Sequence, residues 1–319
     1  MSGEIVLLLG PPAGGKTSLA QPYVDRGYAR VNRDTMGPSA RTADLAPTVE
    51  HLVEQGQRTF VLDNLFLTRE RRAAVLAVGQ KYNIPVVARV LDTRPEQAQF
   101  NAARRMIQRY GSLISASEKK DHPQAKDDDN VFPPVVLSNY FKVFEHPTVD
   151  EGFAEVQSVH FNFQLGPEYI NRAVIFDLDG TLRVCKSGAK YPTDPDDVAL
   201  AFPGIPEKLW QLRERGYLLL AATNQSGVAK GALTVMQMND CITRTYALVG
   251  HDLHAVACTH PSGPPSCWCQ KPMPGMGVAL IERYRLNPRE CLYIGDMTKD
   301  KTFAGRCGFG FAFAEDYFK

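Results

Sequence analysis

The chain has 319 residues, of which 44% are hydrophobic and 22% charged, and its formal net charge is +1. This length suits about two domains at roughly 150 residues each, and the composition excludes a fibrous or disordered protein. Neither half carries a bulk excess of lysine and arginine, so any contact with nucleic acid must be local.

The cysteines and the first residues indicate where the protein works. The 7 cysteines are scattered or clustered in ways that do not suggest a disulfide scaffold. The sequence opens into IVLLL, residues 5–9, without a basic leader or cleavage site, and this run is far too short to span a bilayer. We therefore expect a soluble, reduced, cytoplasmic protein with no membrane partner.

In the first half, short apolar runs alternate with amphipathic stretches. Runs rich in Val, Ile and Leu predict buried parallel strands, and the stretches between them predict helices. The predicted strands are residues 5–9, 29–32, 60–63 and 85–92, and the predicted helices are residues 42–55 and 68–82. Residues 117–130 are charged and lack an apolar face, which predicts a mobile lid or a surface loop.

A second α/β series follows a linker near residues 164–170. Its apolar runs are AVIFDLDG, YLLLAATNQ and CLYIGD, each again short enough for a buried strand. The sequence therefore predicts an α/β protein with two doubly wound parallel-sheet domains, residues 1–166 and residues 167–319.

Residues 10–17, GPPAGGKT, fit the phosphate-binding pattern G-x-x-x-x-G-K-[ST]. In this pattern Lys16 reaches the β and γ oxygens of a nucleotide, Thr17 holds Mg²⁺, and backbone N–H groups cradle the phosphates. The glycines that would form the cradle are Gly10, Gly14 and Gly15. The position between a predicted strand and a plausible helix favours ATP and Mg²⁺ binding over the alternative, a glycine-rich turn with an exposed lysine.

Three further features of the first half fit phosphoryl transfer, each with a structural alternative. Asp63 ends the run TFVLD, where a carboxylate supports the Mg²⁺ shell or caps a helix. Asp34 in VNRDT follows the second predicted strand and is a candidate general base, or again a helix cap. Arg104 and Arg105 in NAARRM are candidate lid arginines that would neutralise the transferring phosphoryl group, or solvated surface arginines.

The string ARVNRDTMGPSAR, together with VLDN and HPTVDEGF, resembles the kinase domain of polynucleotide 5′-kinase/3′-phosphatases over residues 4–162. The resemblance implies that Asp34 activates a 5′-hydroxyl, that Arg41 contacts a substrate phosphate and that Arg105 is the better match to the lid arginine. The chain departs from the animal pattern at Ala102 and Ala103, where Asn and Arg would be expected.

Separated pieces of the second half supply the parts that phosphoaspartyl chemistry requires. Asp177 would attack phosphorus, and Asp179 would protonate the leaving oxygen and later activate water. Thr223 and Asn224 would hydrogen-bond phosphate oxygens. Lys271 would supply positive charge where the transition state gathers negative charge.

The same half offers a second Mg²⁺ site. Asp296 in YIGDMTKD would bind the ion with Asp177 and the Asp179 carbonyl, while Asp300 would orient that shell or Lys271. The ordered set resembles the haloacid dehalogenase (HAD) phosphatase superfamily, which implies a HAD-like Rossmannoid fold beside the P-loop kinase fold. The alternative is a set of coincidental turns.

A cluster of metal-binding residue types lies in a loop rich in Pro and Gly. Its members are Cys258, His260, Cys267 and Cys269. Three thiols and one imidazole form a complete tetrahedral set for a structural Zn²⁺, and free surface thiols are the alternative. The pattern resembles the zinc loop of histidinol-phosphate and heptose-bisphosphate phosphatases, although Gln270 stands where those relatives often carry Arg.

Together these features predict an enzyme that heals nucleic-acid ends, phosphorylating 5′-hydroxyl ends of DNA or RNA with ATP and removing 3′-phosphates. A sugar or nucleoside kinase fused to a sugar-bisphosphate-type phosphatase is the alternative, which the zinc loop favours. A module that senses ends with inactive folds is a third hypothesis. We find no ligase segment, so we expect a separate ligase as a partner.

Overall fold

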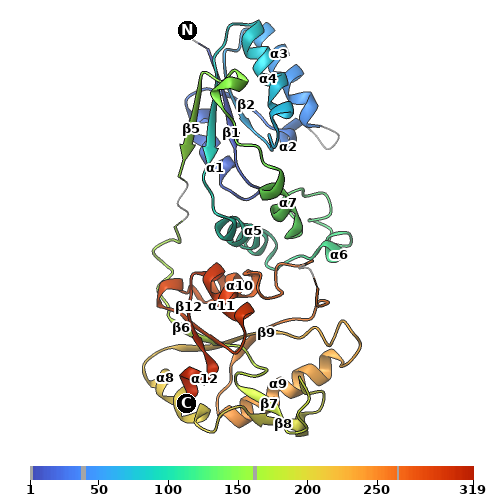
Figure 1. Ribbon diagram of the computed structural model, residues 1–319, viewed down its shortest axis with the longest axis vertical. Coiled ribbons are helices and arrows are strands. Elements are labelled where there is room, and N and C mark those ends of the chain that lie inside the picture. The colour runs from blue at the N-terminus through green and yellow to red at the C-terminus, as the bar shows by residue number, and fades with distance from the viewer. Residues whose placement is uncertain (1–2, 37–40, 161–163, 264–265) are drawn as a thin grey trace. The chain divides into compact units, whose positions relative to one another are not determined.

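The computed structural model describes residues 3–36, 41–160, 164–263 and 266–319, without the side chains of Asp34 and Thr35. These residues form two compact units: residues 1–98 with 135–163, called here the N-terminal unit, and residues 99–134 with 164–319, the C-terminal unit. Residues 99–134 therefore lie within the predicted first domain in sequence but pack in the C-terminal unit. Figure 1 shows the chain coloured along its length.

The N-terminal unit contains a parallel five-stranded sheet in the order β2-β3-β1-β4-β5. Its strands are β1 (Glu4–Leu9), β2 (Ala29–Val31), β3 (Thr59–Asp63), β4 (Val86–Leu91) and β5 (Glu155–Val159). Leu8 of β1 pairs with Asp63 of β3. The carboxyl ends of these neighbouring strands therefore meet at one edge of the sheet, where ligands of open α/β sheets bind.

Helix α1 (Lys16–Asp25) covers one face of this sheet, and α3 (Leu45–Glu54) and α4 (Arg69–Lys81) cover the other. The unit also contains α2 (Arg33–Met36), α7 (Val135–Val143) and short 3₁₀ turns at Thr42–Asp44 and Val149–Glu151. Alternate residues of β1 face opposite sides. Val6 and Leu8 pack with Ala20 of α1, whereas Ile5 and Leu7 belong to the cluster that includes α3 and α4.

The C-terminal unit contains a second parallel sheet in the order β10-β9-β6-β11-β12 and a small antiparallel pair, β7-β8. The strands are β6 (Ala173–Phe176), β7 (Arg183–Cys185), β8 (Val198–Leu200), β9 (Leu218–Asn224), β10 (His254–Cys258), β11 (Leu292–Gly295) and β12 (Gly310–Phe313). The strand β6 lies at the centre, so the residue that follows it leaves the sheet in the middle of its carboxyl edge.

The helices associated with this unit are α5 (Pro95–Tyr110), α6 (Ala116–Lys119), α8 (Ile205–Glu214), α9 (Val235–Val249), α10 (Gly275–Tyr284), α11 (Thr298–Cys307) and α12 (Ala314–Phe318), with 3₁₀ turns at Pro195–Asp197 and Pro288–Glu290. Helix α5 begins in the N-terminal unit, and its larger part, from Gln99 onward, belongs to the C-terminal unit. The prediction of two parallel-sheet α/β domains is confirmed.

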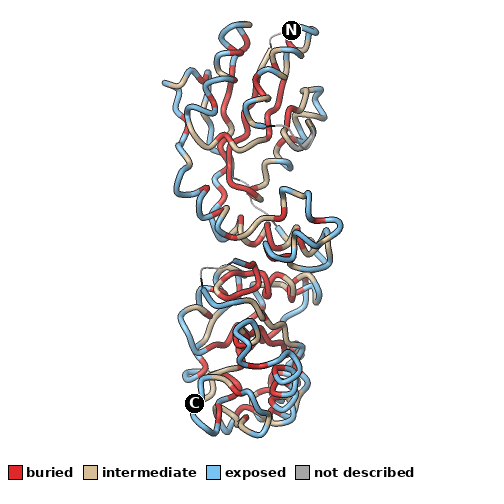
Figure 2. Tube along the Cα trace, turned by 90° about the vertical axis from the view of Figure 1, so that its right-hand side faces the viewer, coloured by how far each residue is buried: buried red, intermediate tan, exposed pale blue. Residues whose placement is uncertain are grey.

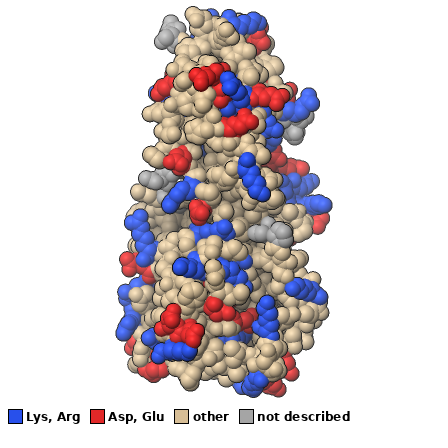
Figure 3. Space-filling view, in the orientation of Figure 1, with Lys and Arg blue, Asp and Glu red and all other residues tan. Residues whose placement is uncertain are grey.

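Burial and charge follow the architecture. Buried residues run along the strands of both sheets (Figure 2). Acidic and basic side chains are interspersed on the face drawn in Figure 3, as the formal net charge of +1 leads one to expect. Over the described part of the chain, every helix is too short or too polar to cross a lipid bilayer.

Candidate active sites

The phosphate-binding loop connects β1 to α1. Gly15 caps α1 with φ 98°, in the left-handed region that glycine adopts without strain, and the Gly14 N–H donates to the Pro11 carbonyl at 2.9 Å. The Lys16 ammonium donates to the carbonyls of Gly10 (3.0 Å) and Pro11 (2.9 Å). The loop thus holds its lysine beside the backbone N–H groups of the α1 amino end, where an anionic phosphate binds favourably.

Asp63 lies beside this loop at the end of β3 and is 4% exposed. Its Oδ2 accepts from the Thr17 hydroxyl at 2.9 Å and from the Arg30 guanidinium at 2.6 Å, while Asn32 donates to its carbonyl at 2.6 Å. Helix α4 is capped by Thr68, which excludes a capping role for Asp63 on that helix. A hydroxyl and a carboxylate at this spacing suit a hydrated Mg²⁺, because this ion prefers oxygen ligands.

The other predicted residues of the first half lie in three places. The backbone of Asp34 lies within helix α2, and its side chain is outside the described part of the structure. Arg41 is exposed, and its backbone N–H donates to Asp44 at 2.6 Å. Arg105 lies on α5 in the C-terminal unit, where its guanidinium donates to the Asn130 carbonyl at 2.8 Å.

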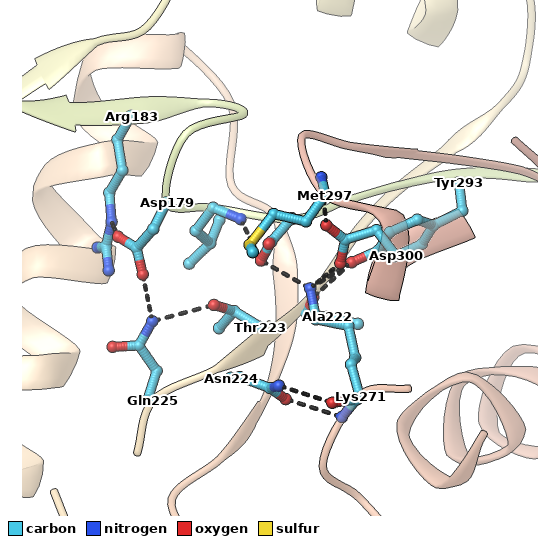
Figure 4. A network of polar contacts seen from close by, with 12 residues as sticks. Asp179, Arg183, Ala222, Thr223, Asn224, Gln225, Lys271, Tyr293, Met297 and Asp300 are labelled. Carbon is cyan, nitrogen blue, oxygen red and sulfur yellow. Dashed lines mark hydrogen bonds and ion pairs between the residues drawn. The ribbon is translucent and has the colours of Figure 1, made fainter. Parts of the chain in front are cut away.

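A buried ion cluster marks the carboxyl edge of the second sheet. The Lys271 ammonium lies 2.9 Å from Asp177 Oδ1 and 2.7 Å from Asp300 Oδ1 (Figure 4). Burial lowers the pKa of Lys271, but the two carboxylates outweigh it, so the net pKa is raised and the group stays charged. Asp177 directly follows β6, and its Oδ1 also accepts from the Leu178 N–H at 2.8 Å.

Two neighbouring residues hold Lys271 in place. Asn224 accepts from the Lys271 backbone N–H at 2.9 Å and donates to its carbonyl at 3.1 Å. The Tyr293 hydroxyl accepts from the Lys271 ammonium at 2.7 Å and donates to the Ala222 carbonyl at 2.9 Å. In this structure Asn224 therefore positions the lysine, and the contact that we predicted from Asn224 to phosphate oxygens stays a prediction.

In Figure 4, Asp179 lies at the upper left and Lys271 at the lower right, on opposite sides of the group of contacts. Its Oδ1 accepts from the Arg183 Nε at 2.7 Å, and its Oδ2 accepts from the Gln225 amide at 2.8 Å. The same amide donates to the Thr223 hydroxyl at 2.9 Å. Both carboxylate oxygens are thus oriented by neighbours, which fixes the side chain that sequence analysis predicts as the acid and base.

Three carboxylates in this region can hold a cation. Asp177, Asp296 and Asp300 offer oxygens within 4.8 Å of one another. Partial burial of its carboxyl group, with the charges of Asp177 and Asp300, raises the pKa of Asp296 to about 6. A Cβ at Gly180 would lie 2.4 Å from Asp296 Oδ2, so only glycine lets this carboxylate approach the loop. The oxygen donors and their mutual repulsion fit Mg²⁺.

The predicted cysteine and histidine ligands converge at the end of β10. The ligand atoms of Cys258, His260, Cys267 and Cys269 lie within 4.8 Å of one another. Contacts between the thiols run from 3.2 to 3.8 Å, and His260 Nδ1 lies 3.1 Å from the Cys269 sulfur. Hydrogen bonds from the Cys258 and Cys269 thiols lower the pKa of Cys267, and contacts with neighbouring thiols raise the pKa of Cys258 and of Cys269, so the three thiols share one thiolate charge in the absence of metal. The donor set fits a tetrahedral Zn²⁺.

Sequence reasoning missed several residues that shape these sites. Gln225 and Arg183 orient Asp179, Tyr293 contacts Lys271, and Arg30 pairs with Asp63. Two of them had a signal in the sequence. Gln225 directly follows the predicted pair Thr223 and Asn224, and Arg183 lies one helical turn's spacing after Asp179. Tyr293 and Arg30 come together with their partners only through the sheets.

Comparisons with known proteins match the two halves of the sequence to different families. Residues 172–318 match the family Polynucleotide kinase 3 phosphatase, and residues 5–121 match the family AAA domain. A "Bifunctional polynucleotide phosphatase/kinase" of Schizosaccharomyces pombe is 30% identical over 159 residues, which cover 50% of this chain and 34% of that relative. The chain therefore spans about a third of the length of this relative.

Two other similarities cover different shares of the chain. A "D-glycero-beta-D-manno-heptose-1,7-bisphosphate 7-phosphatase" of Pseudomonas putida is 34% identical over 134 residues, covering 40% of this chain and 74% of the relative. A solved structure described as the "Pnkp1/Rnl/Hen1 complex" contains a chain with 13% identity and a TM-score of 0.35, covering 98% of this chain and 96% of that one.

The fold and the sites define the class: the chain joins a P-loop kinase domain, which uses ATP and Mg²⁺, to an HAD-type phosphatase domain, which uses Mg²⁺. Within that class, residues 172–318 match the Polynucleotide kinase 3 phosphatase family, and half of the chain is similar to a bifunctional polynucleotide phosphatase/kinase.

Proposed function

We propose that this protein heals nucleic-acid ends, phosphorylating 5′-hydroxyl ends with ATP and removing 3′-phosphates through a phosphoaspartyl intermediate. The observation that carries the proposal is the Asp177, Lys271 and Asp300 ion cluster in a domain that matches the polynucleotide kinase 3 phosphatase family. A carboxylate nucleophile beside a buried ammonium suits phosphoryl transfer, because the ammonium counters the charge of the transition state.

In the phosphatase reaction, an Asp177 oxygen forms a bond to phosphorus while the bond from phosphorus to the 3′-oxygen breaks. Asp179 gives its proton to that leaving oxygen. Asp179 then takes a proton from water as the water oxygen attacks phosphorus, and the bond to Asp177 breaks to release phosphate. Arg183 and Gln225 orient Asp179 for both steps, and Thr223 is proposed to bind phosphate oxygens.

In the kinase reaction, the oxygen of a 5′-hydroxyl attacks the γ-phosphorus of ATP, and the bond to the β-phosphate oxygen breaks. Asp34 is proposed to accept the hydroxyl proton, on the basis of its position after β2. Lys16 and the backbone of Gly14 and Gly15 would hold the phosphates. Arg41 is proposed to contact a substrate phosphate, and Arg105 remains the candidate lid arginine.

Bound metals would supply charge and rigidity at three places. Thr17 and Asp63 would hold the Mg²⁺ that accompanies ATP, and Asp177, the Asp179 carbonyl and Asp296, with Asp300 nearby, would hold the Mg²⁺ that screens the phosphate. The Cys₃His cluster, which ends two residues before Lys271, would hold a structural Zn²⁺. At each of these three sites, the donor atoms are of the type that the ion prefers and lie close to one another.

A second candidate function is that of a small-molecule kinase joined to a sugar-bisphosphate phosphatase. The similarity to the heptose-bisphosphate phosphatases and the Cys₃His cluster support it. The VNRDT segment and the match at residues 172–318 support the polynucleotide substrate instead. If ends are healed, sealing them would require a separate ligase.

A single assay distinguishes the two candidate functions. The protein is given an oligonucleotide with a 5′-hydroxyl and a 3′-phosphate, labelled ATP and Mg²⁺, in parallel with D-glycero-β-D-manno-heptose 1,7-bisphosphate. We expect label at the 5′ end and phosphate release from the 3′ end, with little release from the sugar. Lys16→Ala should abolish only the first activity and Asp177→Asn only the second. An oligonucleotide left unchanged at both ends would refute the proposal.

A further inference from the structure

Residues 99–134, called here the docked segment, follow the kinase strand β4 in sequence but pack in the C-terminal unit. This segment contains most of α5, the short helix α6 and the turns that follow it. It also carries Arg105, the candidate lid arginine. The contacts that hold the segment therefore decide where a predicted kinase residue lies.

The first contact is a half-buried ion pair. Arg104 of α5 lies 2.6 Å from Glu282 of α10, with side-chain exposures of 16% and 8%. Glu282 also accepts from the Tyr169 hydroxyl at 2.8 Å and from the Gln108 amide at 3.2 Å. An ion pair shielded from water and supported by further hydrogen bonds is stronger than an exposed one.

The second contact reaches the metal-ligand loop. Trp268, between the ligands Cys267 and Cys269, is 1% exposed and donates its indole N–H to the Phe132 carbonyl at 2.7 Å. The two rings pack edge to face with centroids 5.9 Å apart. The Arg105 guanidinium lies over the same Phe132 ring, 5.9 Å from its centroid. Phe132 therefore connects the loop to the candidate lid arginine.

Two further approaches complete the interface. The Gly275 N–H donates to the Trp268 carbonyl. A Cβ at Gly275 would lie 2.7 Å from the Leu113 side chain, so Leu113 packs directly against the Gly275 backbone. Glu118 Oε2 lies 3.8 Å from His260 Nε2, while His260 Nδ1 faces the thiols. A carboxylate near the second nitrogen of a ligand histidine is a common way to orient the ring.

We propose that the Cys₃His loop and α10 form a metal-dependent dock for the docked segment. Metal bound by the four ligands fixes the loop that carries Trp268, and Trp268 in turn holds Phe132 and the segment that contains Arg105. A metal site in the phosphatase domain therefore positions part of the kinase chain. The dock itself rests on contacts within one unit, whereas its effect on catalysis rests on the proposed function.

The tryptophans allow a test that needs no substrate. The chain has 2 tryptophans, Trp210, which is 53% exposed, and Trp268, which is 1% exposed. In a Trp210→Phe background, emission reports Trp268 alone. Metal is removed with a chelator, its loss is verified by atomic absorption, and hydrogen exchange is followed in residues 99–134, with helix α8 as the internal reference.

We expect metal loss to shift the Trp268 emission to longer wavelength and to speed exchange in the docked segment by about tenfold, a loss of about 1.4 kcal/mol of docking energy, with α8 still protected. Unchanged emission and exchange in verified apo-protein would overturn the proposal. Uniform loss of protection, α8 included, would overturn it as well, because the metal would then hold the whole unit.

A second variant tests the dock without touching the metal. Arg104→Gln should speed exchange in the docked segment, and the matched control Arg109→Gln, an exposed arginine on the same helix that pairs with Asp128 inside the segment, should have a smaller effect. Equal effects of the two variants would contradict the dock. A wild-type protein that heals no ends would refute the proposed function alone.

Discussion

The Lys271 ammonium lies 2.9 Å from the Asp177 carboxylate and 2.7 Å from that of Asp300. The lysine is 3% exposed and Asp177 is 5% exposed, so water screens neither charge effectively. This pairing holds the predicted nucleophile beside a cation before substrate arrives. It also places the positive charge where the transferred phosphoryl group would develop its negative charge.

We predict that Lys271→Met lowers 3′-phosphate release by about 10²–10³-fold, the usual loss when one preorganised stabiliser of a transition state is removed. The variant leaves two buried carboxylates uncompensated, so its thermal unfolding should be measured beside the initial rate. Kinase activity in the same preparation serves as the control for folding. Retention of full phosphatase activity by a folded Lys271→Met protein would remove the lysine from the proposed mechanism.

Asp296 predicts a pH-dependent stability in the absence of metal. Its pKa of about 6 in the folded protein lies above the usual carboxyl value. The protonated form therefore adds stability that is fully present below the unfolded-state pKa and is lost as the pH rises through 6. Asp296→Asn should raise the midpoint of thermal unfolding at pH 7.5, and the difference from wild type should disappear toward pH 4.

With added Mg²⁺ at pH 7.5, the wild-type protein should have a higher midpoint of thermal unfolding than Asp296→Asn. The reason is that the ion stabilises the ionised wild-type carboxylate more than the amide. Asp316→Asn on α12, an exposed carboxylate outside the cluster, is the matched control. A midpoint difference that does not depend on pH would show that the effect of Asp296→Asn comes from packing and not from charge.

Much of the fold could be predicted because its central strands are buried on both faces. β1, β3 and β4 appear in the sequence as continuous apolar runs, and so do β6, β9 and β11. In the two five-stranded sheets, sequence reasoning missed β5, β10 and β12, which lie at the edges; it also missed the small antiparallel pair β7-β8. Edge strands are less covered, so EVQSV of β5 shows no continuous apolar run.

The docked segment shows a second limit of prediction from hydrophobic patterning. Residues 117–130 have no apolar periodicity, yet polar contacts within the segment organise them. Lys119 donates to the carbonyls of Asp128 and Val131, each at 2.9 Å, and Tyr110 donates to the Asp128 carboxylate at 2.6 Å. Such contacts depend on three-dimensional proximity, and hydrophobic patterning does not report them.

The contact between Thr17 and Asp63 predicts the behaviour of the kinase. Asp63→Asn keeps the size of the side chain but removes the charge that would support Mg²⁺ and that pairs with Arg30 at 2.6 Å. We expect 5′-phosphorylation to fall by about 10²-fold or more, with a higher Mg²⁺ requirement and unchanged 3′-phosphate release. Rates measured over a range of Mg²⁺ concentrations test this.

The conservative control is Thr17→Ser, which keeps the hydroxyl that donates to Asp63 at 2.9 Å. It should retain most of the kinase activity, whereas Thr17→Val should behave like Asp63→Asn. If Thr17→Val and Thr17→Ser were equally active, the hydroxyl would have no part in holding the ion.

A buried ion pair in the N-terminal unit predicts that a substitution outside the proposed active sites will lower the stability of this unit. Arg72 of α4 is 0% exposed and makes two hydrogen bonds to Glu151, at 2.7 and 2.6 Å. It also donates to the carbonyls of Phe66 at 3.2 Å and Glu145 at 2.8 Å. Glu151 lies in HPTVDEGF, so this string joins the start of β5 to α4.

Glu151→Ala would leave the Arg72 charge buried and unpaired, which typically costs about 3–5 kcal/mol. We expect chemical denaturation to show a loss of this size in the N-terminal unit, with 3′-phosphate release preserved under conditions where 5′-phosphorylation is lost. The matched control is Glu155→Ala, which breaks the more exposed pair with Arg89 and should cost at most about 1 kcal/mol. Equal costs for the two variants would mean that burial of the Arg72 pair does not set its contribution.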